Sequence, residues 1–142
     1  MTKKIFFSAF FSFCLATLSF SQLEKTIHQT FDVSQSNAIS FDLVSDSTVI
    51  VPWAGNNVLT ETKIELYDAS PSILKHFIEK DQRYAIQADS TSGVFRLSSV
   101  KMKREPIRTK NGECYENVQI RLFVPDDFEL QGKNKLVRVD EN

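Results

Sequence analysis

Cysteine, histidine, glycine and proline are all scarce in this chain of 142 residues, which holds two cysteines, two histidines, four glycines and four prolines. So little glycine and proline excludes a flexible linker and a low-complexity tract, and we find no internal repeat. His28 and His76 have no cysteine or second histidine at metal-ligand spacing, which argues against a zinc site. The sequence also lacks a Gly-x-Ser-x-Gly elbow, a Gly-rich phosphate loop and a calcium-loop pattern. We therefore expect no metal, no cofactor and no enzymatic activity.

The one long apolar run lies at the N-terminus. Lys3 and Lys4 form a basic head, residues 5–18 (IFFSAFFSFCLATL) are almost wholly apolar, and Ser19-Phe20-Ser21 offers small residues before Gln22. This pattern predicts a secretory signal peptide over residues 1–21, too short for a stable membrane span. An alternative is a lipoprotein signal with lipidation at Cys14. That alternative is disfavoured because the bulky Phe13 precedes the cysteine.

The predicted mature chain, residues 22–142, is long enough for one domain with its own core. Loss of the two signal lysines leaves 15 basic against 18 acidic residues, a net charge of −3. This weak acidic excess argues against a nucleic-acid binder. Cys114 becomes the only cysteine, so an internal disulfide cannot form and stability must come from packing. We expect an exported protein, located in the periplasm, on the outer surface or in the medium.

Alternation of apolar and polar residues dominates the mature chain and predicts strands. The clearest segments are QTFDV (29–33), NAISFDLV (37–44), RYAIQAD (83–89), GVFRLSSV (93–100) and NVQIRLFVP (117–125), with a short, charged edge strand at KLVRV (135–139). In NVQIRLFVP the inward face is predicted to hold Val118, Ile120, Leu122 and Val124.

One segment has helical spacing instead. Ser70 is suited to cap a helix and Pro71 to occupy its first position. The apolar residues Ile73, Leu74, Phe77 and Ile78 then form one stripe. The sequence thus predicts a mainly β fold, an antiparallel sheet or β-sandwich of about 7–9 strands, with one short amphipathic helix over about residues 71–81.

Residues 47–66 (STVIVPWAGNNVLTETKIEL) contain two strand patterns separated by Ala54-Gly55-Asn56-Asn57. These four residues tolerate the conformations of a hairpin loop, so we expect the two strands to pair. On the second strand, Val58, Thr60, Thr62, Ile64 and Leu66 share one face. Trp53 has two interpretations: it closes the end of the core, or it is an exposed aromatic tip that binds a sugar or a partner.

The same stretch carries a family resemblance. A strand, then Trp-x-Gly-x-x-Val, then an alternating Glu/Thr/Lys strand resembles the adhesin-like β-strand-repeat domains of uncharacterised exported bacterial proteins. The later ENVQIRLFVP is similar to the strand ending in Val-Pro that precedes the repeats of that family, and the likeness spans about residues 28–130. This chain resembles the opening module of that family without the Gly-, Ser- and Asp-rich repeats, and the resemblance implies a β fold and export. The family supplies no catalytic residues to carry over.

The segment KMKREPIRTKNGECYENV (101–118) is predicted to be a long loop between two strands and is the best candidate for binding. Its basic residues are Lys101, Lys103, Arg104, Arg108 and Lys110. They form either a solvated tip or a site for an anionic envelope component, such as a lipid headgroup, or for another envelope protein. Cys114 has two interpretations: it is a half-buried, inert thiol, since no histidine lies near it in sequence to act as a base, or the same positive charge lowers its pKa and favours a thiolate open to intermolecular pairing or oxidation. Asp126-Asp127 is either a solvated turn or part of a cation site.

From these features we expect an exported, non-enzymatic β-domain that acts as an adhesin-like binding or structural module of the cell envelope. Its candidate binding residues are the five basic residues above and Trp53. Two alternatives stay open: a periplasmic carrier of an apolar ligand, and a small thiol-dependent enzyme that uses Cys114.

Overall fold

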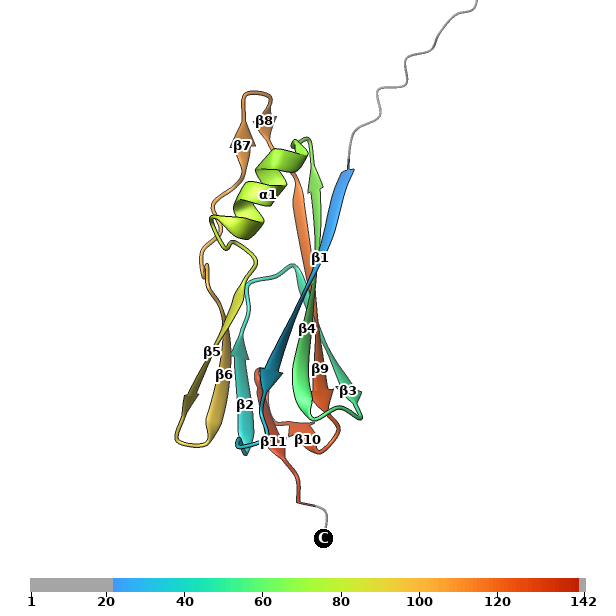
Figure 1. Cartoon of the computed structure of the whole chain (residues 1–142), viewed down its shortest axis with the longest axis vertical. Coiled ribbons are helices and arrows are strands. Elements are labelled where there is room, and N and C mark those ends of the chain that lie inside the picture. The colour runs from blue at the N-terminus through green and yellow to red at the C-terminus, as the bar shows by residue number, and fades with distance from the viewer. Residues whose placement is uncertain (1–21, 141–142) are drawn as a thin grey trace, which may run out of the picture.

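The computed structural model describes residues 22–140, which form two β-sheets packed face to face with one helix at one end (Figure 1). The predicted signal peptide, residues 1–21, lies outside this range. Sheet A consists of β1 (Gln22–Asp32), β4 (Asn57–Tyr67), β9 (Glu116–Pro125) and β3 (Ser47–Trp53), in that order. Sheet B consists of β10 (Phe128–Leu130), β11 (Lys135–Arg138), β2 (Ala38–Asp42), β6 (Val94–Ser99) and β5 (Ile86–Thr91), in that order. A small hairpin, β7 (Arg108–Thr109) and β8 (Gly112–Glu113), and the helix α1 (Pro71–Glu79) complete the fold.

The prediction of a mainly β fold with one short helix is confirmed. Within residues 22–140 there are eleven strands rather than about 7–9, because β7, β8 and β10 are only two or three residues long. Segments of that length are too short to show a period of two. Both sheets are mixed: β3 is parallel to β9 and β2 is parallel to β6, whereas the other pairs are antiparallel.

The expected hairpin between the strands of residues 47–66 is wrong. β3 and β4 do not pair, because β9 lies between them in sheet A. β4 already pairs with β1 along its other edge, in a register that joins Gln22 to Tyr67 and Asp32 to Asn57. Residues 54–56 therefore carry the chain across the end of β9 rather than around a tight turn. Alternation shows that a segment is a strand, but it does not show which strand lies beside it.

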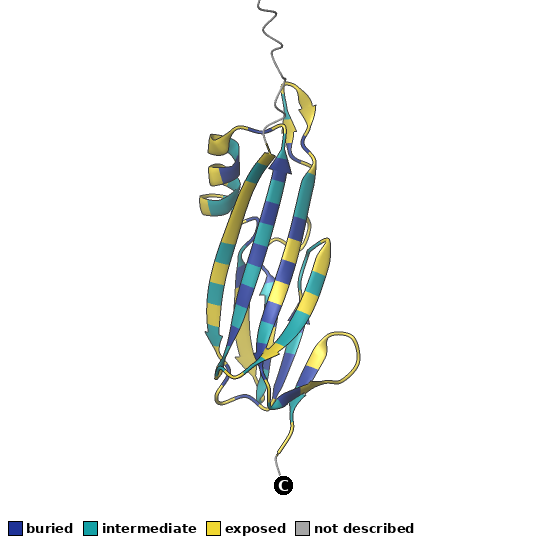
Figure 2. Cartoon of the chain, turned by 90° about the vertical axis from the view of Figure 1, so that its right-hand side faces the viewer, coloured by how far each residue is buried: buried dark blue, intermediate teal, exposed yellow. Residues whose placement is uncertain are grey.

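The core lies between the two sheets, and the alternation in the sequence predicted much of it correctly. All five predicted inward residues of β4 are buried, from Val58 to Leu66, and so are the four of β9, from Val118 to Val124. The opposite residues of both strands are more exposed, which produces the stripes in Figure 2. Ile39, Phe41, Phe95 and Leu97 of sheet B complete the apolar interior.

The helix forms as its sequence predicts. The Ser70 hydroxyl accepts a hydrogen bond from the Ile73 amide, 3.4 Å away, and Pro71 occupies the first turn. Leu74 is buried, and Ile73, Phe77 and Ile78 pack against the core. The helix covers the end of the sandwich where sheet A extends beyond sheet B (Figure 1).

Two other connections decide how sheet B is built. β5 and β6 form a hairpin whose turn residues, Ser92 and Gly93, both have positive φ, as a tight two-residue hairpin requires. The strand near the C-terminus, β11, was expected at an edge, but it lies between β10 and β2. The edges of sheet B are β10 and β5, so Lys135–Arg138 does not offer the free edge that its charge suggested.

A side chain of β1 forms hydrogen bonds to the backbone of sheet B. Gln29 of β1 donates a hydrogen bond from Nε2 to the Ile86 carbonyl at 3.0 Å, and its Oε1 accepts one from the Ile86 amide at 2.9 Å. Gln29 thus pairs with the backbone of sheet B as another residue of a strand would. Nearby, Phe31 and Phe95 meet edge to face with ring centroids 6.3 Å apart.

The inward face of β4 carries a polar atom whose removal should stabilise the fold. The Thr62 hydroxyl is buried and has no hydrogen-bond partner among the described residues. We expect Thr62→Val to raise the free energy of unfolding by about 1 kcal/mol, because it removes a buried, unsatisfied hydroxyl and keeps the branched shape. Chemical denaturation measures this change.

Thr60→Val is the matched control, since the Thr60 hydroxyl donates to the Gln29 carbonyl at 3.4 Å. It should gain less stability than Thr62→Val. An equal gain, or a loss at Thr62, would contradict the assignment of Thr62 as the unsatisfied group.

Candidate functional site

A recess opens at the end of the sandwich that α1 and the β7–β8 hairpin occupy. It has a volume of about 410 Å³ and is lined by Arg83, Arg104, Pro106, Ile107, Glu113, Cys114, Tyr115 and Glu116. These residues come from three parts of the chain: the segment before β5, the loop before β7, and the residues that run from β8 into β9.

The chain reversal after α1 places the first group. Gln82 has a φ of 52°, in the left-handed region that turns the backbone sharply. The Arg83 amide then donates to the Phe77 carbonyl at 2.9 Å, which ties this segment to the helix. The Arg83 guanidinium lies 5.2 Å from the centre of the Phe77 ring, a cation–π distance. Arg83 and Tyr84 are thereby held at the recess before β5 begins.

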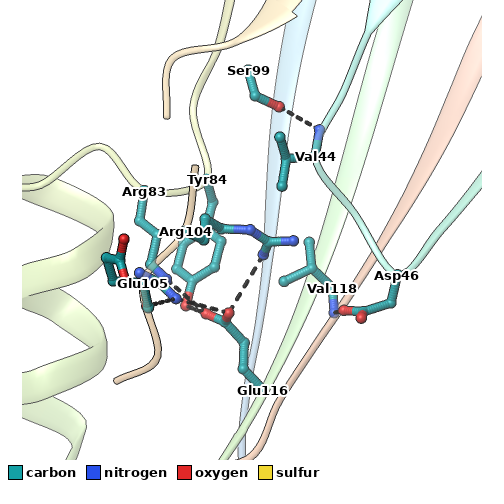
Figure 3. A network of polar contacts seen from close by, with 9 residues as sticks. All are labelled: Val44, Asp46, Arg83, Tyr84, Ser99, Arg104, Glu105, Glu116 and Val118. Atoms are coloured by element: carbon teal, nitrogen blue, oxygen red, sulfur yellow. Dashed lines mark hydrogen bonds and ion pairs between the residues drawn. The ribbon is translucent and has the colours of Figure 1, made fainter. Parts of the chain in front are cut away.

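Arg83 and Tyr84 both bind Glu116, the first residue of β9 (Figure 3). The guanidinium of Arg83 donates from Nε to Oε2 at 2.9 Å and from Nη2 to Oε1 at 3.1 Å, a two-point contact. Nη2 also donates to the Glu105 carbonyl at 2.7 Å, and the Tyr84 hydroxyl donates to Glu116 Oε2. The Arg83 side chain is only 7% exposed and that of Glu116 15%, so water screens this pair weakly.

Arg104 brings a second guanidinium to the same carboxylate. Its Nη1 lies 3.5 Å from Glu116 Oε1, and its side chain is 11% exposed. Its Nε and Nη1 are buried, and no atom of the described residues accepts a hydrogen bond from them. Two guanidinium groups thus share one carboxylate, and one positive charge at the recess has no buried carboxylate of its own.

The pKa values of this cluster follow from the burial and the contacts. Burial opposes ionisation of Glu116, but the hydrogen bonds from Arg83 and Tyr84 outweigh it and hold the pKa of the carboxyl below its usual range. Burial raises the pKa of Tyr84, and donation to the Glu116 carboxylate raises it further. Burial opposes the charge of Arg83, yet the hydrogen bond and charge of Glu116 leave its pKa raised. At neutral pH the cluster therefore holds two cations, one anion and a neutral phenol.

Three of the five predicted basic residues, Lys101, Lys103 and Arg108, line a second pocket of about 250 Å³ beside Arg83, whereas Arg104 lines the recess. Lys101 pairs with Asp81 at 3.5 Å and Lys103 with Glu105 at 3.2 Å, both at the surface. Arg108 and Lys110 are exposed on the β7–β8 hairpin. Only Arg104 turns inward to the recess. Its burial could not be predicted from the sequence, because a strongly charged segment is typical of a solvated loop.

Arg83, Tyr84 and Glu116 were not among the candidate residues predicted from the sequence. Arg83 and Tyr84 open a segment that was predicted to be an ordinary strand, and Glu116 belongs to a loop that was read for its basic residues. Arg83 and Glu116 are 33 positions apart. Only their convergence in the fold shows that they act together.

Cys114 is buried, and its thiol donates to the Asp68 carbonyl at 3.5 Å. Burial raises its pKa, and the charges of Asp68 and Glu116 raise it further. The expectation that neighbouring basic residues would lower the pKa of this thiol is therefore wrong. The positive charges either pair with other carboxylates or lie farther out on the hairpin, so the neutral thiol is the favoured form.

Trp53 does not close the core, and it is not fully exposed either. Ile50 of β3 packs against the core, so the alternate residues Val49, Val51 and Trp53 face outward. The indole N–H of Trp53 donates to the Asn57 carbonyl at 2.9 Å, and its ring lies 6.0 Å from that of Phe123. A Cβ on Gly55 would come within 2.5 Å of the indole, so this position favours glycine. Trp53 and Gly55 hold the crossing between β3 and β4 in place.

The remaining candidates have structural contacts. His28 lies 3.3 Å from Glu61 on the outer face of sheet A, and His76 meets the Phe77 ring edge-on. The Asp126 amide donates to the Trp53 carbonyl at 3.0 Å, and Asp127 pairs with Arg138. Within residues 22–140, no group of three or more His, Cys, Asp or Glu residues is arranged to hold a metal ion.

No protein-family model, no curated protein and no solved structure matches this chain. Among the helices of the described residues, none has the length and apolar character needed to cross a membrane.

Proposed function

We propose that this protein is an exported, non-enzymatic binding module of the bacterial cell envelope, which holds an anionic group in the recess beside Arg104. The observation that supports the proposal most directly is the sharing of Glu116 by Arg83 and Arg104. One carboxylate neutralises one of the two guanidinium groups. Arg104 itself lines the recess, and among the described residues its guanidinium has no carboxylate of its own there.

Arginine is suited to this role because its planar guanidinium presents several donors to a carboxylate or a phosphate. Partial burial strengthens the attraction, since the field of Arg104 is not fully screened by water. The exposed Arg108 lies on the adjacent β7–β8 hairpin, and its positive charge would draw an anion toward the recess. Glu113 also lines the recess but is exposed, so its charge is solvated.

The envelope location rests on the predicted signal peptide. An envelope anion reaches such a protein either as a lipid headgroup or as a phosphate or carboxylate that is free or carried by a glycan. Both sources present the same chemistry to Arg104.

The apolar carrier is a weaker alternative. A groove of about 370 Å³ runs between β1 and α1, with Leu23, Leu74 and Ile78 in its lining. Four charged residues line the same groove: Glu24, Lys25, Lys75 and Glu79. These residues add charge to a lining whose exposed surface is otherwise mostly apolar, so the groove stays the site of the alternative function.

Arg104→Gln tests the proposal, because it removes the charge and keeps a polar side chain, although one that is two atoms shorter. We expect inorganic phosphate to raise the melting temperature of the wild type and to have little effect on this variant. Its affinity for phosphate, measured by calorimetry, should fall about tenfold or more. Lys110→Gln is the control, since it removes one exposed charge and should retain most of the affinity.

Vesicles distinguish the two sources of the anion. Binding to phosphatidylglycerol but not phosphatidylcholine vesicles, lost in Arg104→Gln and kept in Lys110→Gln, would assign the lipid headgroup. Phosphate binding without vesicle binding would assign a free or glycan-borne anion. If the wild type binds neither, or if the two variants lose affinity equally, the recess is not the site.

A further inference from the structure

The outer edge of β3 is the basis of a second inference, independent of the recess. β3 is the last strand of sheet A and pairs with β9 along one side, so within the described residues its other side is a free strand edge. In Figure 1 it lies at the far side of the sandwich from the β5–β6 hairpin. Free edges expose backbone donors and acceptors to other chains.

The hydrogen bond from Asp126 to Trp53 shows which backbone groups face outward. The Trp53 carbonyl accepts from the Asp126 amide at 3.0 Å, so the backbone of Trp53 points toward β9. Because the direction of the backbone N–H and C=O groups alternates along a strand, those of Val49 and Val51 also point toward β9. Thr48, Ile50 and Pro52 therefore point to the free edge. Pro52 has no N–H and is one of the residues whose backbone points to the free edge, where a proline is tolerated.

The side chains of β3 include no charged group that would oppose pairing at this edge. The strand reads STVIVPW and contains no charged residue, although charges commonly protect strand edges from pairing. Val49 points outward from the sheet and is 53% exposed, among the most exposed large apolar residues of the described chain. The other edges differ: β1 carries Glu24, Lys25 and Asp32, β10 has three residues, and β5 is polar and exposed after Ile86.

We propose that β3 pairs antiparallel with β3 of a second copy of this chain, about a two-fold axis at Val49. This register sets Thr48 opposite Ile50 of the second copy, and Ile50 opposite its Thr48. Both residues of each pair point to the edge, so the two pairs form four backbone hydrogen bonds. The two copies of Val49 then face each other as a non-hydrogen-bonded pair, with Cα atoms about 4.5 Å apart.

The pairing joins two copies of sheet A into one continuous sheet and uses the same residues on both copies, as a two-fold dimer requires. Pro52 lies just outside the hydrogen-bonded centre and limits the pairing to Thr48–Ile50. The exposed Val49 side chains bury each other on the outer face. Cross-strand partners in a non-hydrogen-bonded pair make the closest side-chain contact.

Charge favours a second copy over a charged peptide as the occupant. β3 offers no charge for such a peptide to pair with. The nearest charge on the outer face, Arg121, lies opposite Val49 on β9. The two copies of Arg121 would be three strand spacings apart, about 14 Å. That separation exceeds the Debye length of about 10 Å at 0.1 M salt, so their repulsion is small.

Charge swapping at residue 49 tests this register. The protein, expressed from its full chain and purified from the fraction in which it accumulates, is studied by sedimentation velocity over a range of concentrations. The wild type should form a reversible dimer. Val49→Lys and Val49→Glu should each raise the dissociation constant about tenfold or more, because like charges face each other across the axis. An equimolar mixture of the two variants should dimerise again.

Two further variants make the test specific. Val49→Cys should form a disulfide-linked dimer under mild oxidation, since Cα atoms so close together are compatible with a disulfide. Leu130→Lys, at another exposed apolar residue, should dimerise like the wild type. A wild type that stays monomeric at its highest soluble concentration, a Val49→Lys variant that still dimerises, or a mixture that does not recover would each overturn the proposal. None of these outcomes depends on anion binding.

Discussion

Replacing Glu116 by alanine should lower the free energy of unfolding by about 3–5 kcal/mol, the usual cost of removing one partner from a buried ion pair. The reason is that Arg83 is 7% exposed and loses both contacts to the carboxylate. Tyr84 loses the acceptor of its hydroxyl, and Arg104 loses its nearest negative charge. Three buried polar groups are left without Glu116, two of them charged. Urea denaturation followed by circular dichroism measures the loss.

Glu113→Ala provides the control, because Glu113 lies three positions earlier but is exposed. It should change the stability by less than about 0.5 kcal/mol, as a surface substitution usually does. Glu116→Gln should fall between the two, since its amide oxygen still accepts a hydrogen bond but carries no charge. A Glu116→Ala variant as stable as Glu113→Ala would show that the pairs contribute nothing to the fold.

The stabilisation that Glu116 and Tyr84 contribute should depend on pH. The pKa of Glu116 is lowered in the folded protein. The contribution of Glu116 to the free energy of unfolding is therefore fully present above the ordinary pKa of 4.5. That contribution is lost as the pH falls through the lowered folded value. The pKa of Tyr84 is raised, so its contribution is present below its ordinary value of 10.0 and is lost at higher pH. We expect the wild type to lose more stability than Glu116→Gln between pH 5 and pH 2.

The second large effect is expected in the core. Leu97 lies in β6, with Phe41 of β2 and Ala88 of β5 as its neighbours in register, and its side chain is fully buried. Leu97→Ala should cost about 2–5 kcal/mol, because it removes buried apolar surface and leaves a cavity between the sheets. The midpoint of thermal unfolding, measured by calorimetry, should fall by several degrees.

Leu130→Ala serves as the comparison, since it makes the same chemical change at a side chain that is 54% exposed. Its stability should stay within about 0.5 kcal/mol of the wild type. Equal losses at the two leucines would mean that sheet B is not packed as described.

Local patterns predicted the elements of this fold but not their neighbours. The alternation of β4 and β9 predicted the inward faces correctly, because a strand between core and solvent must alternate. The cap at Ser70 and the stripe from Ile73 to Ile78 likewise predicted α1, since helix capping and amphipathic spacing are local properties. The position of β9 between β3 and β4 has no local signal. It depends on pairing between segments about seventy residues apart, as the register of Ser47 with Gln119 shows.

The candidate site was predicted less well than the fold. Arg104 was among the predicted binding residues, but its burial was not foreseen, and Glu116 and Arg83 were not considered. A charged residue is expected at the surface unless a partner accompanies it inward. For Arg83 that partner, Glu116, is 33 positions away and becomes a neighbour only when α1, the segment before β5 and β9 come together.

The position of β9 also determines the order in which the fold can be completed. β4 can pair with β1 early, but the partner of β3 is the strand formed by residues 116–125. β2 likewise pairs with β6 and β11, which follow it by more than fifty and ninety positions. Neither sheet can close on a growing chain until nearly all of it is available. Such long-range topology slows folding, so the incompletely folded chain exposes unpaired strand edges for longer before its native structure forms.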